Sequence, residues 1–329
     1  FWEVGTSLNS TQSRSQFTWF CYWNFIKSCN DIISIVVDPQ TDDMKAYLAY
    51  AKANRAALYL DLARGFDPLE NNYTDVSKVK GLTVPSKLSK KNAVSNVSFD
   101  VHAGEIVCIA GIDGNGQSEL VFGISGLENV SGGTVKMLGK DITNMPIRKR
   151  SLLGMSHIPE DRHKHGLVLD DSLENNIVLQ KYKEKRFQTF GFINRPAVRE
   201  YAESIIEQFD VRSGQGPVTT ARSMSGGNQQ KAIIGREIDR ENPLLIAVQP
   251  TRGLDVGAIE YIHSQLVAQR DSGKAVLLVS LELDEVMNVS DRILVMYEGE
   301  IVGEFDPETT TVEELGLYMA GAKRDEVKA

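Results

Sequence analysis

Short apolar runs bounded by glycine, proline and polar residues recur along the chain from residue 76 onward. Runs of this kind, four to seven residues long here, are typical of buried strands, and stretches with helical spacing separate the later ones. An alternation of strands and helices predicts an α/β fold. The expected strands cover residues 79–84, 95–101, 105–109, 133–138, 155–158, 244–248, 275–279, 292–297 and 300–305.

Between residues 160 and 222 the apolar residues recur mostly with helical spacing. We expect helices at 173–180 and 196–209 in this stretch, followed by a loop at 213–220. A further helix at 258–270 separates two of the later strands. The pattern therefore predicts a mostly helical insertion within an α/β core.

The N-terminal part of the chain follows a different pattern. Residues 1–40 crowd Ser, Thr, Asn, Trp and Cys together without helical or strand periodicity, so we expect them to be poorly ordered and dispensable for folding. Residues 42–64 carry an apolar helical face, and Gly65 is positioned to end such a helix. A start at Phe1 rather than Met is typical of a fragment.

Composition and charge exclude some classes of function. The chain has 329 residues, a formal net charge of −8 and 42% hydrophobic residues, an ordinary balance for a globular protein. The acidic balance argues against nucleic acid as a partner, because nucleic-acid binding relies on clustered Lys and Arg. No run reaches the ~18 apolar residues of a membrane span. Of the cysteines Cys21, Cys29 and Cys108, we expect Cys108 to be a buried thiol, because it lies in an apolar strand.

A glycine-rich segment follows the apolar run 106–109 and precedes a helical stretch. Its spacing, Gly111-x-x-x-x-Gly116-x-Ser118, matches the P-loop, in which backbone N–H groups at a helix N-terminus cradle a phosphate. Where the P-loop pattern requires Lys, this chain has Gln117, so the loop keeps its backbone donors and a hydroxyl but lacks the cation. A glycine-rich turn with no ligand is the alternative interpretation.

A second glycine pair opens the segment Ser225-Gly-Gly-Asn-Gln-Gln-Lys231, which leads into an apolar-periodic stretch. Two glycines allow the backbone to approach an anion, and a helix that begins there points its free N–H groups and its positive dipole end at that anion. The ligand that this segment predicts is a phosphate. A plain linker is the alternative, since Ser-Gly-Gly is common in loops.

Taken together, these segments resemble the nucleotide-binding domain of ABC transporters. The degenerate P-loop, the segment 225–229, the run Pro250-Thr-Arg-Gly-Leu-Asp255 and the run Leu278-Val-Ser-Leu-Glu-Leu-Asp-Glu285 occur in the order of that family. More narrowly, the chain looks like the second, C-terminal half of the fused ATP-binding proteins of nucleoside and simple-sugar importers. The stretch from Gln249 to Ala258 favours the nucleoside branch.

The resemblance covers residues 76–322 and implies a fold. That fold is a P-loop NTPase core of the ABC type, with a small antiparallel β-subdomain and an inserted helical subdomain at about 160–232. Residues 1–75 lie outside the resemblance as an N-terminal segment, and residues 323–329 form a tail.

The resemblance also implies roles for the residues of these motifs. ATP would be bound by Gly111, Asp113, Gly114, Asn115, Gly116, Gln117, Ser118 and Glu119, and the Ser118 hydroxyl would be a weak Mg²⁺ ligand. The signature loop would consist of Ser225, Gly226, Gly227, Asn228 and Gln229, and the D-loop of Gly253, Leu254 and Asp255.

Several catalytic groups of the family are replaced in this chain. Hydrolysis of a nucleoside triphosphate requires charge neutralisation, a metal ion and a group that activates water. The family's acidic pair after the strand 244–247 is Val248 and Gln249, its switch His is Leu281, and its metal-linking Gln is Glu160. Because Gln117 also lacks the cation, no catalytic residue is intact, and we expect the isolated chain to be inactive.

The intact signature loop implies a different role. In ABC dimers each nucleotide lies between the P-loop of one domain and the signature loop of the other. This resemblance implies that the chain completes a site for ATP and Mg²⁺ whose P-loop belongs to a catalytic half, normally fused upstream, while its own P-loop forms the inactive site.

The implied partners are that catalytic half, transmembrane permease subunits and, indirectly, an extracytoplasmic substrate-binding protein, at the cytoplasmic face of the membrane. Two alternatives stay open, a non-hydrolysing ATP-binding scaffold and the same role in a simple-sugar importer. A soluble ABC-type ATPase of ribosomes or DNA repair is disfavoured by the negative charge.

Overall fold

The computed structural model of the chain describes residues 75–87 and 91–325, together with Cys29, Met44, Lys45, Leu48, Ala49, Ala51 and Lys52. The chain divides into two compact units, Phe1–Asn72 and Tyr73–Ala329. Our expectation for residues 1–40 lies outside the described residues, Cys29 excepted. Within the predicted helix 42–64, the few described residues are helical, and the remainder also lies outside the description.

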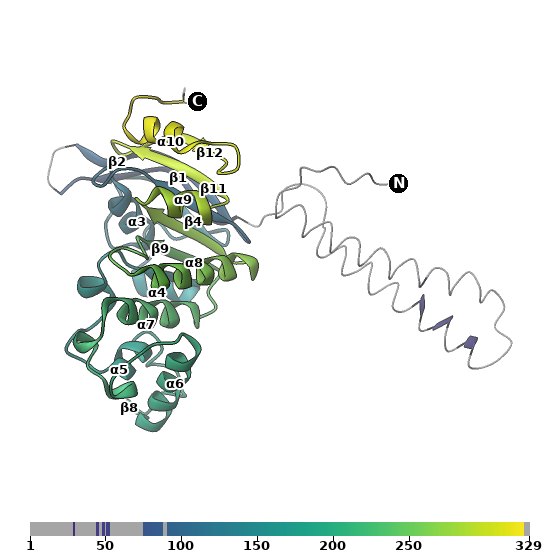
Figure 1. The fold of residues 1–329 in the computed structure, drawn as a ribbon, viewed down its shortest axis with the longest axis vertical. Helices are drawn as coiled ribbons and strands as arrows, with labels where there is room; N and C mark the ends of the chain where they lie inside the picture. Colours follow the sequence, from purple (N-terminus) through teal and green to yellow (C-terminus); the bar gives the residue numbers. More distant parts are fainter. Residues whose placement is uncertain are drawn as a thin grey trace. The chain divides into compact units, whose positions relative to one another are not determined.

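A six-stranded sheet forms the centre of the second unit (Figure 1). Its strand order is β12-β11-β3-β10-β9-β6, and all neighbouring strands are parallel except the antiparallel pair β11 and β12. Every residue of β3, β9 and β10 is buried, which explains their continuous apolar sequences. The strands are β3 (Ile106–Ala110), β6 (Met155–Ile158), β9 (Leu244–Val248), β10 (Ala275–Ser280), β11 (Arg292–Tyr297) and β12 (Glu300–Phe305).

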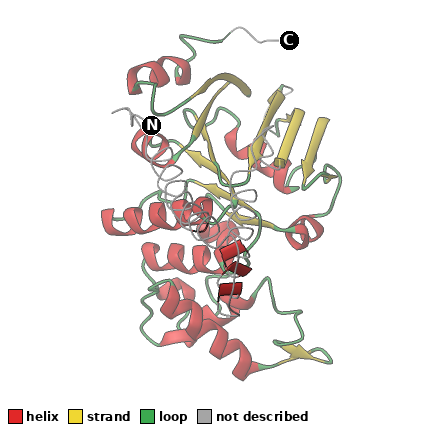
Figure 2. Ribbon diagram, turned by 90° about the vertical axis from the view of Figure 1, so that its right-hand side faces the viewer, coloured by secondary structure: helices red, strands yellow, loops and turns green. Residues whose placement is uncertain are grey.

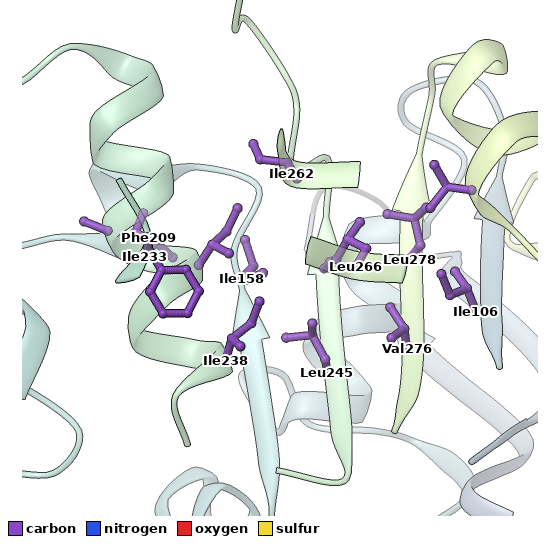
Figure 3. Close-up of a cluster of buried hydrophobic side chains, with 14 of the residues drawn as sticks. Ile106, Ile158, Phe209, Ile233, Ile238, Leu245, Ile262, Leu266, Val276 and Leu278 are labelled. Atoms are coloured by element: carbon purple, nitrogen blue, oxygen red, sulfur yellow. The ribbon is translucent and has the colours of Figure 1, made fainter. Parts of the chain in front are cut away.

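The two faces of this sheet belong to two different hydrophobic clusters, because successive side chains of a strand point to opposite faces. In β3, Ile106 and Cys108 lie in one cluster, whereas Val107 and Ile109 lie in the other. Cys108 is fully buried, as the sequence predicted, and burial raises the pKa of its thiol to about 12. Figure 3 shows part of the first cluster, with labelled side chains Ile106, Ile158, Phe209, Ile233, Ile238, Leu245, Ile262, Leu266, Val276 and Leu278.

Helices cover the first face and a second sheet packs near the other. The predicted antiparallel β-subdomain is present as a four-stranded sheet in the order β2-β1-β4-β5. Its apolar residues join the helix α3 and the second face of the central sheet in one cluster. The strands of this subdomain are β1 (Asp75–Pro85), β2 (Asn92–His102), β4 (Gly132–Met137) and β5 (Lys140–Asp141).

In Figure 2 one group of helices lies apart from the strands, while further helices lie beside the strands. Those of eight residues or more are α3 (Gln117–Ser125), α6 (Arg195–Gln208), α7 (Gly226–Ile238), α8 (Val256–Asp271) and α10 (Val312–Met319). Shorter ones are α4 (Ile147–Leu153), α5 (Leu173–Val178), α9 (Leu283–Val289) and a π-helix at Arg162–Gly166. Among the described helices, none is long and apolar enough to cross a membrane.

The predicted helical insertion contains a feature that periodicity did not indicate. Its helices α5 and α6 lie within one residue or two of the expected bounds, and they pack against α7. Between them, β7 (Gln188–Thr189) and β8 (Phe192–Ile193) form a two-stranded hairpin. Strands of two residues are too short to produce an alternating pattern, so the hairpin was not predicted.

Candidate nucleotide-binding site

The glycine-rich loop connects the end of β3 to the start of α3, as the P-loop spacing predicted. Gly114 and Gly116 have φ angles of +87° and +101°, in the left-handed region that favours glycine. Gly116 is also the N-cap residue of α3, and a Cβ atom there would lie 2.3 Å from the Ala93 carbonyl oxygen. The second glycine of the pattern is therefore required by the fold itself.

Gln117 occupies the position where the P-loop has its lysine, and its side chain turns inward. It is 4% exposed, and its Nε2 donates to the Ile112 carbonyl oxygen over 3.1 Å. A Cβ atom on Gly111 would lie 2.4 Å from this Nε2, so the amide fills the space inside the loop. The side chain thus satisfies a carbonyl group of the loop and offers no cation to a ligand.

The other loop residues that the sequence analysis singled out lie around this turn. Asp113 and Gly114 are exposed, while Glu119 is half-buried in the first turn of α3. Asn115 ties the loop to the turn between β11 and β12: its carbonyl accepts from Gly299 N and its side-chain oxygen from Glu298 N, over 2.9 and 3.0 Å. This contact was not predicted, because it joins distant parts of the chain.

Ser118, the predicted metal ligand, is engaged by Glu160. Its hydroxyl donates to Glu160 Oε2 over 2.8 Å. The other carboxylate oxygen, Oε1, accepts from Gln249 Nε2 over 3.1 Å and from Arg252 Nη1 over 2.8 Å. Glu160 therefore contacts both Ser118 and Gln249 directly. It also contacts Arg252, which the sequence analysis did not place in the site.

The remaining replaced positions lie at the carboxyl ends of neighbouring parallel strands, where ligands of open α/β sheets bind. Val248 ends β9 and is buried, and Gln249 follows with φ +44° and donates its N–H to Val279 O over 2.7 Å. Leu281 follows the end of β10 and is half-buried. Neither Val248 nor Leu281 carries a group that could hold a metal ion or activate water.

The predicted signature loop begins the helix α7. Ser225 is the N-cap residue, and its hydroxyl accepts from Asn228 Nδ2 over 2.8 Å. Asn228 Oδ1 accepts from Arg212 N over 2.7 Å. Gln229 is buried, and its Nε2 donates to Ala221 O over 2.9 Å. Side chains of this segment therefore hold the loop in shape and leave the helix N-terminus facing outward.

The two signature glycines have different surroundings. A Cβ atom on Gly226 would lie 2.9 Å from Arg162 Nη2, whereas one on Gly227 would meet only ordinary contacts, Asp255 Oδ2 at 3.7 Å and Ala258 Cβ at 3.6 Å. A side chain at Gly227 would therefore cause no close contact at its Cβ atom. A cavity of about 330 Å³ lies beside it, lined by Asp210, Arg212, Ser225, Gly227, Asn228, Lys231, Asp255, Gly257 and Ala258.

Of the predicted D-loop, Asp255 lines this cavity. Asp255 caps α8 by accepting from Ala258 N over 2.9 Å, and Gly253 has φ +69°. Leu254 is half-buried and packs against the first hydrophobic cluster. The structure therefore brings the segments 225–228 and 255–258 together, although nothing in their separate patterns fixed that contact.

Arg162 and His163 are site residues that the sequence analysis missed. Both belong to the π-helix, which Asp161 caps by accepting from His163 N and Lys164 N over 2.9 and 3.0 Å. His163 Nε2 lies 3.0 Å from Gln229 Oε1 on the signature helix. Asp161 before a basic run was the available sequence signal for the start of a helix. It did not reveal the contacts of that helix with α7.

A second, larger groove of about 630 Å³ lies among α4, α5, α7 and the end of β6. Its apolar wall contains Leu127, Ile147, Leu152 and Leu179, which are between 42% and 71% exposed. Its basic residues include Arg148, Lys164 and Arg240. His157 also lines this groove, and burial lowers the pKa of its imidazole to about 4.

The fold and the two glycine loops define an ATP-binding cassette. A solved structure described as the ATP-binding subunit of an ABC transporter matches with a TM-score of 0.60 at 20% identity, over 74% of this chain and 99% of that one. A nucleotide-free ATP-binding cassette from an ABC transporter matches with a TM-score of 0.58 at 21% identity, over 70% of this chain and 91% of that one.

Sequence comparisons identify the family. Residues 94–252 match the family model described as ABC transporter. The guanosine import ATP-binding protein NupO of Bacillus subtilis is 52% identical over 252 residues, which are 77% of this chain and 49% of that protein. The nucleoside import ATP-binding protein NupA of Lactococcus lactis is 54% identical over 71% of this chain and 46% of that protein. The chain therefore belongs to the ABC transporter family, as an ATP-binding domain.

The relatives also include a glucose import ATP-binding protein of Haloferax volcanii, 47% identical over 70% of this chain and 42% of that protein. The chain thus spans about half the length of the curated relatives it matches. Its similarity is higher to the two nucleoside-related proteins than to this sugar-related one.

Proposed function

We propose that this chain is one ATP-binding half of an ABC importer, and that it contributes its signature loop to a composite ATP site while its own P-loop is inactive. The observation that carries the proposal is the contrast between the two loops. The P-loop is closed on itself by Gln117 and Ser118 is bonded to Glu160, whereas Gly227 borders a cavity.

Energetics support an inactive P-loop. A single donor that stabilises the transition state is typically worth about 3 to 4 kcal/mol, and about 1.4 kcal/mol corresponds to a tenfold change in rate. At this site the replacements Gln117, Val248, Gln249 and Leu281 remove the cation, the metal support, the water-activating group and the switch contact together. Hydrolysis by the chain's own site is therefore expected to be negligible.

ATP and Mg²⁺ fit the signature side better than the P-loop side. The free N–H groups at the start of α7 and the dipole of that 13-residue helix favour an anion, and the adjoining cavity leaves room for one. Ser225, Gly227 and Asn228 would hold the terminal phosphate of an ATP bound by the other half. At the P-loop, the Ser118 hydroxyl and the Glu160 carboxylate are of a type that could ligate Mg²⁺, but they are hydrogen-bonded to each other. The metal would neutralise charge on the phosphates during transfer.

The transported compound is proposed to be a nucleoside. The support is the 52% and 54% identity to the two proteins named for guanosine and nucleoside import. A simple sugar is the alternative, since a glucose import protein is 47% identical. Transported molecules contact other subunits, so no residue of this chain reads the substrate directly.

The chain would act at the cytoplasmic face of a membrane through permease subunits. These subunits are proposed to dock in the groove beside α4. Exposed apolar residues with a basic rim suit a short amphipathic segment that carries acidic side chains. Leu152 is 71% exposed there, so Leu152→Glu should weaken co-purification with the permease without lowering the melting temperature. The extracytoplasmic substrate-binding protein would contact only the permease.

The composite-site proposal is tested by measuring ATPase activity in two preparations. The purified chain alone, and its Gln117→Lys variant, should show no ATPase above background. The chain combined with a catalytic half that has the P-loop lysine and the acidic pair should hydrolyse ATP. Steady turnover by the chain alone that is lost in Ser118→Ala would contradict the proposal. Stable ATP binding by the pair with no turnover would favour the scaffold alternative.

A further inference from the structure

Glu160 connects the chain's own glycine-rich loop to the turn after β9. One carboxylate oxygen accepts from Ser118 at the start of α3, and the other accepts from Gln249 and Arg252. Glu160 therefore receives three hydrogen bonds from two elements that are far apart in the sequence. Its side chain is only 25% exposed, which shields these bonds from water more than a surface pair would be.

The residues that follow Glu160 reach the signature helix. Asp161 fixes the π-helix Arg162–Gly166 by accepting two backbone N–H groups. His163 contacts Gln229, and Arg162 lies against Gly226 so closely that no Cβ atom would fit between them without a shift. Arg162 Nη1 also donates to the Arg252 carbonyl oxygen over 3.2 Å. Segment 160–166 therefore touches both glycine loops.

We propose that Glu160 is a positioning residue that links the two glycine loops of this chain through its own side chains, so that the link needs no bound nucleotide. The carboxylate holds the start of the π-helix against Ser118 and Arg252. The π-helix in turn holds the first turn of α7 through Arg162 and His163. This inference deepens the proposed function. It rests on that function only for the role of the signature loop in the composite ATP site.

The physical reason is the number of donors on one carboxylate. A single exposed ion pair contributes little, and Arg252 is 56% exposed, but hydrogen bonds from Ser118 and Gln249 to the same charged group are stronger than neutral ones. Loss of the carboxylate leaves all three donors without this acceptor. Because His163 contacts Gln229 and the Arg162 guanidinium lies beside Gly226, a shift of the π-helix reaches the first turn of α7.

The link is tested by hydrogen–deuterium exchange on the purified full chain, read at the backbone amides of residues 225–229. Glu160→Ala should speed exchange there by about tenfold, the size expected when charge-assisted hydrogen bonds are lost. Exchange in α6 should change by less than about twofold. Adding MgATP to the unmodified chain should also change exchange at 225–229 by less than about twofold.

Matched variants separate positioning from general destabilisation. Glu160→Gln keeps the shape and one acceptor, so its effect should be intermediate, and it also keeps the test valid if Glu160→Ala folds poorly. Arg252→Ala should speed exchange and Arg252→Lys should restore it, since Lys keeps the charge. Glu200→Ala, which removes the exposed ion pair with Arg186, is the control and should have no effect at residues 225–229.

Two results would overturn the link. One is exchange at 225–229 that stays within about twofold in both Glu160 variants. The other is strong protection of these amides by MgATP in the unmodified chain, because the link would then depend on nucleotide. The experiment uses neither turnover nor a second half, so its failure is distinguishable from a failure of the composite-site proposal.

Discussion

The loop between β3 and α3 and the loop before α7 are both glycine-rich segments at a helix N-terminus, and they differ in what lies against them. In the first, the Gln117 amide fills the loop and Ser118 is bonded to Glu160. In the second, Gly227 has no close neighbour at its Cβ position and borders a cavity of about 330 Å³. The two helix starts therefore offer an anion very different access.

The difference teaches that a glycine pattern reports backbone shape, whereas the side chains around it decide whether the shape is available. Both helices present free N–H groups, as any helix start does. At α3 a neutral amide lies inside the loop, at the position where the P-loop pattern has a lysine. At α7 the polar side chains Asn228 and Gln229 turn toward their own subdomain, and the N-terminus is left to face a partner.

The sharpest test of this comparison replaces one glycine in each loop. Gly227→Glu should lower the ATPase activity of the paired complex by about 10²- to 10³-fold, because the side chain would fill the cavity and repel a phosphate. The fold of the chain should survive, since a Cβ atom there meets only contacts of 3.6 Å or more. The measurement is turnover at saturating ATP, with assembly of the complex checked.

The matched change in the other loop is Gly114→Asn. Gly114 has φ +87° with no atom within 4 Å of an added Cβ, and Asn tolerates left-handed backbone better than most residues. Gly116 is unsuitable, because its Cβ would collide with Ala93 O. Gly114→Asn should cost much less turnover than Gly227→Glu. A larger loss from the Gly114 variant would mean that the degenerate P-loop is the working site.

Acid should lower the free energy of unfolding of the chain, because His157 lies in β6, the strand that leads into Glu160. Burial holds the pKa of His157 at about 4, below its ordinary value of 6.5, so the folded state keeps this imidazole neutral. Between those values the unfolded chain binds a proton that the folded chain does not. The contribution to stability is complete above pH 6.5 and is lost as the pH falls toward 4.

The expected loss over that window is on the order of 2 to 3 kcal/mol, measured by urea unfolding at a series of pH values. His157→Gln should flatten the dependence between pH 6.5 and 4, whereas His165→Gln, which removes only the smaller effect of a nearby charge on the His157 pKa, should change it much less. An unchanged slope in His157→Gln would assign the acid sensitivity to other groups.

A smaller effect is expected from removing the Gln117 side chain that fills the P-loop. Gln117→Ala removes a buried side chain and its hydrogen bond to Ile112 O, which should lower the free energy of unfolding by about 1 to 2 kcal/mol. Turnover of the paired complex at saturating ATP should hardly change. If turnover fell with little change in stability, Gln117 would have a role in the reaction, and the contrast between the two loops would be weaker than we infer.

The smallest effect concerns the region that contains neither loop. Both loops belong to the unit Tyr73–Ala329, so removal of residues 1–40 should change the free energy of unfolding of that unit by less than about 0.5 kcal/mol. Limited proteolysis should yield a stable fragment that begins after Asp42. A protected N-terminus whose removal destabilises the remainder would contradict this expectation.

The strands were the most predictable part of the fold. The expected bounds of β6, β9, β11 and β12 coincide with the observed ones, because glycine, proline or acidic residues mark the ends of these short strands. Helices of seven or eight residues, α4, α9 and α10, were not predicted, since two turns give too few positions to define a period.

The site was predictable as a set of motifs but not as a set of contacts. Gln117 was identified as a missing cation, yet its burial inside the loop follows only from the path of the backbone around Gly111. Glu160 was identified as a replaced residue, while its partner Arg252 lies far along the chain. Such pairs depend on how β6 and β9 are placed side by side, and local patterns carry no information on that placement.

The strand order of the central sheet has a consequence for the way the chain acquires its structure. β3, which carries the P-loop, pairs only with β10 and β11, whereas β1, β2 and β4 pair among themselves early in the sequence. During synthesis the small antiparallel sheet can form while β3 still waits for residues 275–297. Closing such a long loop is slow, so the phosphate loop is among the last parts of this domain to take shape.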